Sequence, residues 1–245
     1  MTGPVGRSGP VVRVLGPIEI VGASGPLTSQ QRSLVAYLAC VGPSGRERIV
    51  DALWDGRPVS GRRFANLLSE VRAALGREHV PDAVGGRYRL VGIDTDLDHF
   101  ERLVAPSGRM RRERAPAPTT EVEAAEVQAL EAALALVRGT ALCPPGGRHW
   151  AWLDQYPELT ARTEAAVAEV ACRLAALHRA GGDLERARRA CERGLACSPL
   201  DRSLVTALEA VYLDQGRPGV ARRLVRSWQA RMARLDGVPP DRVAS

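Results

Sequence analysis

The sequence predicts a mainly helical protein with a small amount of β-structure, divided into two regions of different architecture. The first region places short β-branched runs on either side of three amphipathic segments, and the second is almost wholly helical with an internal repeat. A stretch rich in proline, glycine and arginine separates them. We therefore expect a flexible N-terminus at 1–10, a first domain at 11–104, a linker at 105–120 and a helical domain at 121–245.

The composition is that of an ordinary globular protein with a basic balance. Of the 245 residues, 45% are apolar and 25% are charged, and the formal net charge is +6. A basic balance favours an anionic partner such as nucleic acid, although an arginine excess also serves solubility alone. Every basic residue is arginine, which is typical of coding in a GC-rich genome, so arginine content does not decide between these two interpretations.

The chain carries no signal for export or for a membrane. No stretch approaches the ~20 apolar residues that a membrane helix needs, and residues 1–10 lack the apolar core of a signal peptide. The five cysteines are an odd number without close CxxC pairs, as expected for free thiols in a reducing compartment. We expect a cytoplasmic chain with no membrane contact.

Two short strands open the first region. Residues 11–21 read VVRVLGPIEIV, a β-branched run that Gly16 and Pro17 interrupt, which predicts two strands joined by a turn. Residues 25–27 could open a third strand.

Three helical segments follow these strands, at about 29–41, 46–54 and 60–75. Gly76 ends the third segment in the manner of a C′ glycine. Residues 79–91 then predict a hairpin with Gly85 and Gly86 in its turn. Strands, three helices and a hairpin in this order are the layout of a winged helix-turn-helix.

The third helix has the amphipathic pattern of a helix that reads DNA. At about 100° per residue, its apolar residues form one stripe that must face the core, namely Phe64, Leu67, Leu68, Val71 and Leu75. The other faces and the helix end carry side chains suited to base edges or phosphate, namely Arg62, Arg63, Asn66, Ser69, Arg72 and Arg77. An ordinary solvated helix face would show the same residue types, and Glu70 on this side would repel phosphate.

The hairpin offers a second basic contact. Arg87 and Arg89 alternate with Tyr88 and Leu90, so both arginines lie on one face and can reach the DNA backbone or a narrow minor groove. Over residues 46–89, nine arginines stand against six acids. This weak excess favours a homodimer on paired sites where tight binding is needed.

The second region predicts a stack of paired helices. Its helical segments lie at about 121–138, 150–180, 183–196, 200–214 and 218–235. Gly182 and Gly216 are 34 residues apart, as are Ala187 and Ala221. This period with small residues is the tetratricopeptide (TPR) signature, whose stacked pairs form a surface for protein contacts. A plain helical bundle with chance matches is the alternative.

A cluster of aromatic residues lies just before the long helical segments. His149, Trp150 and Trp152 could line a ligand pocket, which would make the chain a ligand-sensing regulator. A buried aromatic cap on the helical stack is the simpler interpretation.

The residues that would carry catalysis or bind a cofactor are not arranged for either. Asp94-x-Asp96-x-Asp98 has the spacing of a calcium loop, but His99 stands where the turn needs glycine, so the motif indicates a strand end and a helix start. The four histidines lack the spacing of zinc ligands, and the sequence contains no phosphate loop or nucleophile elbow. We expect no catalytic, cofactor-binding or metal-binding residues and no enzyme activity.

Several motifs together resemble one family of actinobacterial regulators. VRVLGPIEI, the Leu53-Trp54 pair, SEVRAALG, GGRYRL and Asp98-x-Phe100 resemble the DNA-binding half of the Streptomyces antibiotic regulatory protein (SARP) family. ALVRGTAL, SPLD and the closing ARRLVRSWQARMARLDGVPPDRV resemble the bacterial transcriptional activator domain (BTAD) of the same family. The resemblance covers residues from about 11 to 243, apart from the linker.

The resemblance implies a winged helix that binds double-stranded DNA, a helical domain that contacts RNA polymerase, and activation of transcription. Two positions depart from the family pattern, because Glu70 stands where arginine is usual and Arg202 where an acid is common. Related domain pairs form the end of larger membrane proteins. The alternative function is therefore a protein-interaction scaffold or adaptor, with a TPR-like partner surface and a winged helix not used for DNA.

Overall fold

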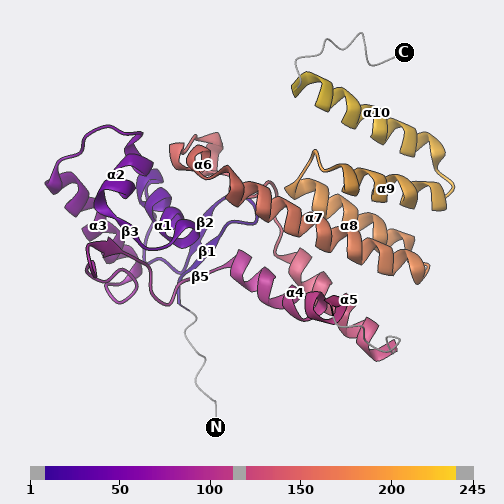
Figure 1. The fold of residues 1–245 in the computed structure, drawn as a ribbon, viewed down its shortest axis with the longest axis horizontal. Coiled ribbons are helices and arrows are strands. Elements are labelled where there is room, and N and C mark those ends of the chain that lie inside the picture. The colour runs from indigo at the N-terminus through magenta and orange to yellow at the C-terminus, as the bar shows by residue number, and fades with distance from the viewer. Residues whose placement is uncertain (1–8, 113–119, 236–245) are drawn as a thin grey trace. The chain divides into compact units, whose positions relative to one another are not determined.

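The computed structural model describes residues 9–112 and 120–235 (Figure 1). The chain divides into two compact units. We call the first, made of residues up to 99 together with 142–161, the winged-helix unit, and the remainder the helical unit. Two of the predicted segments fall partly outside the described residues. These are the flexible N-terminus, at residues 1–8, and the linker, at residues 113–119.

The winged-helix unit has the element order that the sequence predicts. Its elements are β1 (Val11–Arg13), β2 (Glu19–Val21), α1 (Ser29–Val41), β3 (Ser44–Gly45), α2 (Arg46–Trp54), α3 (Gly61–Leu75), β4 (Arg87–Tyr88), β5 (Asp94–Thr95), a 3-10 turn (Pro145–Gly147) and α6 (Ala151–Gln155). α1 and α2 have the predicted bounds, and α3 begins after its N-cap Ser60. Residues 25–27 form no strand, and the two-residue strand β3 is too short to leave a sequence pattern.

A three-stranded sheet lies at the start of this unit. β1 pairs antiparallel with β2 and parallel with β5. Just after β1, the buried carboxylate of Asp96 accepts hydrogen bonds from the backbone N–H groups of Val14 (2.6 Å) and Leu15 (3.2 Å). The motif from Asp94 to Asp98 therefore marks a strand end and a helix start, as predicted.

Residues 79–91 form the predicted hairpin, the wing of the winged helix. At its tip Val84 and Arg87 exchange backbone hydrogen bonds of 3.0 and 3.1 Å. Gly85 and Gly86 between them have φ angles of 57° and 74°, which a type I′ turn requires and glycine adopts without strain. β4 pairs on its other side with β3, so the wing is tied to the start of α2.

A stretch from later in the chain completes the core of the winged-helix unit. Trp152 is fully buried, and its Nε1–H donates to Ser33 Oγ of α1 at 3.1 Å. Its ring meets Tyr37 edge-to-face, with centroids 5.7 Å apart, and stacks on Trp150. The interpretation of Trp150 and Trp152 as a cap on the helical stack is wrong, since these rings pack against α1, and residues 142–161 lie in the winged-helix unit.

The helical unit consists of helices over its described residues. These are α4 (Asp96–Arg112), α5 (Thr120–Ala135), α7 (Pro157–Ala180), α8 (Leu184–Cys197), α9 (Arg202–Asp214) and α10 (Pro218–Leu235), of which α4 and α7 begin in the winged-helix unit. The long helix expected at 150–180 is two helices, because Pro157 disfavours the helical conformation at Tyr156 before it. The expected linker is partly helical, since α4 reaches Arg112.

The repeat of 34 residues recurs in the hydrogen bonds of the helical unit. At the turn between α7 and α8, the N–H of Asp183 donates to the carbonyl of His178 at 2.8 Å. At the turn between α9 and α10, the N–H of Arg217 donates to the carbonyl of Tyr212 at the same distance. The repeat pairs also share their roles: left-handed turn residues Gly182 and Gly216, buried small residues Ala187 and Ala221, and buried Leu174 and Leu208. The predicted TPR-like pairing is confirmed.

Small residues and thiols fill the core of the helical unit. Gly194 of α8 is buried where an added Cβ would lie only 2.7 Å from Ala171 Cβ and from Leu204 Cδ2, so three helices meet there. Burial raises the pKa of Cys191 to about 12 and that of Cys197 to about 11. Over the described part of the chain, no helix combines the length and apolar character needed to cross a membrane.

Candidate nucleic-acid interface

Helix α3 is fixed at both ends and along one side. The Ser60 hydroxyl caps its start by accepting from the N–H of Arg63 at 3.3 Å, and Gly76, with a φ of 98°, ends it. All five residues of the predicted apolar stripe are at most 6% exposed, namely Phe64, Leu67, Leu68, Val71 and Leu75. The amphipathic interpretation of α3 is confirmed, because its apolar side is anchored in the core.

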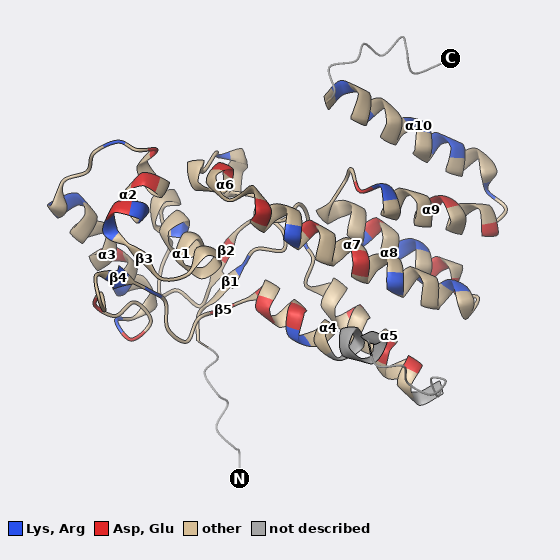
Figure 2. Ribbon diagram, in the orientation of Figure 1, with Lys and Arg blue, Asp and Glu red and all other residues tan. Residues whose placement is uncertain are grey.

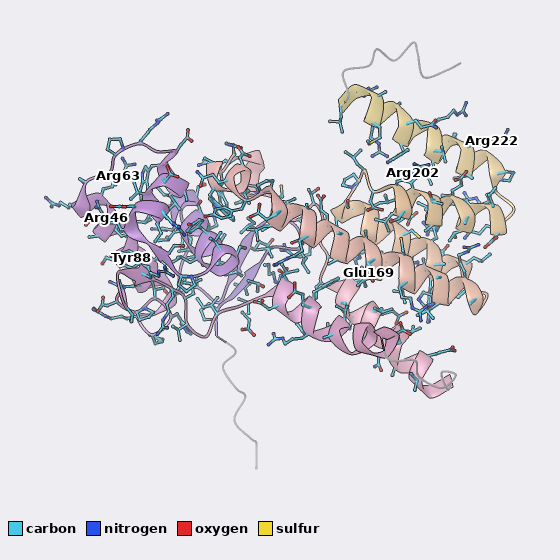
Figure 3. All side chains as sticks on the ribbon, viewed as in Figure 1. Arg46, Arg63, Tyr88, Glu169, Arg202 and Arg222 are labelled. Atoms are coloured by element: carbon cyan, nitrogen blue, oxygen red, sulfur yellow. The ribbon has the colours of Figure 1, made fainter. Side chains whose placement is uncertain are left out.

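The outer side of α3 presents polar side chains to solvent. Arg62, Arg63, Asn66 and Ser69 are all exposed. The Arg63 guanidinium also lies 5.7 Å from the centre of the Trp54 ring at the end of α2. Arg63 is labelled in Figure 3. Guanidinium, amide and hydroxyl groups are the side-chain donors that proteins use on base edges and phosphates.

The carboxylate of Glu70 would repel phosphate, but in the structure it accepts a hydrogen bond from another side chain. Its Oε2 accepts a hydrogen bond of 2.8 Å from Gln31 Nε2. Gln31 in turn belongs to the capping box at the start of α1, where its Oε1 accepts from the Thr28 N–H at 2.7 Å. Glu70 therefore ties α3 to the start of α1, which explains an acid on this side of the helix.

Arg72 differs from the other predicted residues of α3, because its guanidinium is bound within the fold. Its guanidinium donates to the backbone carbonyls of Val80 (2.8 Å) and Pro81 (3.1 Å) and pairs with Asp82 at 3.0 Å. The side chain is only 20% exposed. In this structure Arg72 therefore holds the loop between α3 and the wing, and its contact with DNA stays a prediction.

Arg77 shares the carboxylate of Asp82 but stays accessible. The two side chains pair at 2.9 Å and are 72% and 70% exposed. The hydrogen bond and the charge of Arg77 lower the pKa of Asp82. Such an exposed pair contributes little to stability.

The wing presents the arginines that its alternation predicts. Arg87 and Arg89 are exposed, while Tyr88 and Leu90 are half-buried. Tyr88 packs edge-to-face on Phe64 of α3, with centroids 5.3 Å apart. The ring contact therefore fixes the wing against the helix, and both wing arginines remain free to meet a ligand.

Two further arginines, at the start of α2, were missed by the sequence analysis. The guanidinium of Arg46 lies over the ring of Phe64, 5.6 Å from the ring centre. It also donates a hydrogen bond to the Val59 carbonyl at 3.1 Å. Arg46 and Arg48 are exposed and line a hollow of about 430 Å³ together with Arg87 of the wing. The sequence does contain a feature that points to these two residues. Arginine in the first turn of a helix opposes the helix dipole, so its presence there indicates a role other than helix stability.

The start of α2 is suited to an anion in a second way. Its N-cap is Gly45, which offers no side-chain cap, so the first backbone N–H groups of the helix are not satisfied by a side chain. Three arginines and a helix N-terminus thus surround the hollow, against the single acid Glu47. Among the described residues, no group of three or more histidine, cysteine, aspartate or glutamate side chains could hold a metal ion.

Comparison with known proteins identifies the fold. No family model matches this sequence, and no curated protein matches it. The structure is similar to that of Mycobacterium tuberculosis EmbR in complex with a low-affinity phosphopeptide, with a TM-score of 0.64 and 24% sequence identity. The similarity covers 94% of this chain and 62% of that one, so this chain spans less than two thirds of the EmbR chain. The match confirms the fold class, a winged helix-turn-helix followed by an all-helical repeat domain.

Proposed function

We propose that this chain is a sequence-specific DNA-binding transcriptional regulator of the SARP type and not an enzyme, with α3 as the helix that enters the major groove. One observation carries the proposal: α3 buries its whole apolar stripe and turns Arg62, Asn66 and Ser69 to solvent. A major groove about 12 Å wide admits one helix. Arginine recognises guanine and asparagine recognises adenine by paired hydrogen bonds, so these side chains can carry sequence preference.

The wing and the start of α2 serve as contacts to the DNA backbone or the minor groove. Arg87 and Arg89 are exposed on the wing, and Arg46 and Arg48 lie across the hollow beside it. A phosphate in this hollow would meet guanidinium groups and the N-terminal N–H groups of α2 together. These contacts position the protein on the duplex and carry no sequence information of their own.

We further propose that the helical unit serves dimerisation and contact with RNA polymerase, and that the regulator activates transcription. Support comes from a hollow of about 630 Å³ along α5 and α7, whose lining combines apolar Val127 and Leu177 with polar Glu123 and Gln128. Paired helices of this kind commonly present such a surface to proteins.

The test of the DNA proposal is a binding measurement with the full chain and duplexes selected from a random pool. Replacing Arg62 and Asn66 by alanine should cost about 1–3 kcal/mol on the preferred sequence and little on random DNA. Replacing Arg87 and Arg89 by alanine should weaken binding to every sequence and lower the salt dependence by about one phosphate contact for each arginine. Arg13→Ala, on β1, is the control for loss of an exposed arginine. A protein that selects no sequence from the pool at moderate salt contradicts the proposal.

The second candidate function is a partner-binding adaptor whose winged helix does not contact DNA. The EmbR structure, of which this chain spans 62%, is a complex with a low-affinity phosphopeptide. An adaptor would retain its partner when Arg62 and Asn66 are replaced, and would bind duplexes equally with and without them. The same pair of variants therefore separates the two functions.

A further inference from the structure

We infer that α10 is a second nucleic-acid contact, whose arginine face binds the phosphate backbone of double-stranded DNA. The inference rests on the proposed function, to which it adds a contact made by the helical unit. α10 carries five arginines and no acidic residue. These are Arg222, Arg223, Arg226, Arg231 and Arg234.

The repeat supplies an internal reference for this helix, because α8 occupies the same place in the preceding helix pair. In α8, Arg188 pairs with Glu185 and with Glu192, each at 2.5 Å, and Arg189 pairs with Glu185 at 3.2 Å. These partners draw the pKa of Glu185 down to about 2. The arginines of α8 are thus neutralised by acids of the same helix.

The next repeat keeps these arginines and replaces the acids. Thirty-four residues after Arg188 and Arg189 stand Arg222 and Arg223. At the positions of the two glutamates of α8 stand Gly219 and Arg226. Figure 2 shows the consequence, since α8 alternates basic and acidic segments while α10 has basic segments alone.

The charge of α10 is not satisfied within the described chain. Apart from a 3.4 Å bond from Arg231 to the Ser227 carbonyl, its arginines have neither an ion pair with a described carboxylate nor a ring contact. Arg222, Arg223, Arg226 and Arg234 are all exposed. An arginine row that is not used for folding is free for an anionic partner.

The orientation of the helix is fixed by its apolar side. Ala221 is buried against α9, and the indole Nε1–H of Trp228 donates to the Leu200 carbonyl at 2.9 Å. The arginines therefore face outward, as Arg222 does in Figure 3. A membrane surface is disfavoured as the occupant, because a helix that binds lipid inserts its apolar side. A second copy of the same face is disfavoured because five arginines would meet five.

The spacing of the arginines matches an extended polyanion. Arg222 and Arg226 are one turn apart on one edge of the exposed face, and Arg223 and Arg234 lie on the other edge. From Arg222 to Arg234 the helix rises ~18 Å at 1.5 Å per residue. Duplex DNA carries one charge per about 1.7 Å of its axis, so a comparable length holds about ten phosphates. The guanidinium fork binds phosphate through two parallel hydrogen bonds.

The experiment measures how the affinity of the full chain for a random-sequence duplex depends on salt. The variant R222Q/R226Q should lower the slope of log Kobs against log salt by about 2, since each lost phosphate contact removes about 0.9. The matched control is R186Q/R189Q in α8, whose arginines are similarly exposed but paired with Glu131, Asp183 and Glu185. The control should leave the slope unchanged. Melting temperatures of both variants should equal that of the parent, because all four side chains are at the surface.

Several outcomes would overturn the inference. An unchanged slope for R222Q/R226Q would do so, as would an equal loss in the control. A loss of binding to poly-glutamate or to phosphatidylserine vesicles without a loss on DNA would assign α10 to a different acidic partner. The inference alone fails if three results occur together: the parent binds DNA, R62A/N66A loses sequence preference, and R222Q/R226Q has the same salt dependence as the parent. If the parent binds no duplex, the proposed function fails with it.

Discussion

The winged-helix unit and the helical unit build their cores in opposite ways. In the winged-helix unit, residues far apart in the sequence meet: Trp152 bonds to Ser33, and Asp96 holds the backbone after β1. In the helical unit, neighbouring helices stack, and the bonds of one turn recur 34 residues later. A core substitution should therefore disturb the whole of the first unit but only adjacent helices of the second.

The two units also show that a count of arginines does not locate a binding surface. Arg62 and Arg72 lie on the same helix, but only Arg62 is free, because loop carbonyls hold Arg72. Arg188 and Arg222 are equivalent in the repeat, but acids of α8 neutralise only Arg188. The contacts of each guanidinium decide which arginines remain for a partner.

The largest effect is expected from Trp152→Ala. Removing a fully buried indole should cost about 3–5 kcal/mol of unfolding free energy, by analogy with other buried aromatic truncations. The winged-helix unit should lose its cooperative transition in urea, and sequence-specific DNA binding should be lost with it. Trp228→Ala, in a half-buried site of the helical unit, is the control and should leave the winged-helix transition in place. Retention of both transition and binding in Trp152→Ala would contradict the non-local core.

A smaller effect is expected from Gly194→Val in the helical unit. The added side chain would collide with Ala171 and Leu204, and overpacking of this kind costs about 1–3 kcal/mol. The loss should appear in the transition of the helical unit, while DNA sequence preference stays as in the parent. Gly219→Ala at the start of α10, where only the end of Arg223 is near, is the control and should not destabilise the protein. Equal losses at the two glycines would show that close helix approach is not the cause.

The pair Arg72→Ala and Arg62→Ala separates structural from functional arginines within α3. Arg72→Ala should cost about 1.5–3 kcal/mol, since it removes charged hydrogen bonds to two loop carbonyls. Arg62→Ala should change stability by less than about 0.5 kcal/mol, as is usual for an exposed side chain. Denaturant titration of both variants measures the difference. Matching stabilities would mean that Arg72 does not hold the loop.

The smallest expected effect is on the rate at which buried cysteines react with a thiol reagent. This rate shows which of the two units has unfolded. Burial raises the pKa of Cys191 and of Cys197 to about 12 and about 11, so almost no thiolate forms at pH 8 in the native state. Both should resist a thiol reagent until the helical unit unfolds, and should stay protected in Trp152→Ala. Mass spectrometry of the modified peptides locates each label. Rapid native labelling of either cysteine would contradict the packing of α8.

Features that depend on residue spacing could be predicted from the sequence. The stripe of α3, the Gly85-Gly86 turn and the 34-residue period follow from local periodicity, and all three are present. The exposed residues Arg62, Asn66, Arg87 and Arg89 follow from the same periodicity. Local patterns are reliable here because the backbone conformation itself sets which side chains share a face.

Features that depend on which surfaces meet could not be predicted in this way. A pattern identifies Trp152 as buried but does not identify its partner, which is α1 of the other half of the sequence. The role of Arg72 depends on the path of the loop through Val80, and that of Glu70 on the position of Gln31. The hollow beside the wing exists only because β3 and β4 pair.

The most direct test of the central claim is photocrosslinking from the exposed side of α3. A photoreactive benzoylphenylalanine replaces exposed Ala73 of α3 in one variant and exposed Thr206 of α9 in the control, and each full chain is irradiated with its selected duplex. We expect crosslinks from position 73 to the preferred duplex and none from position 206 to its bases. Failure of position 73 to crosslink in a complex that forms with undiminished affinity would contradict the placement of α3 in the major groove.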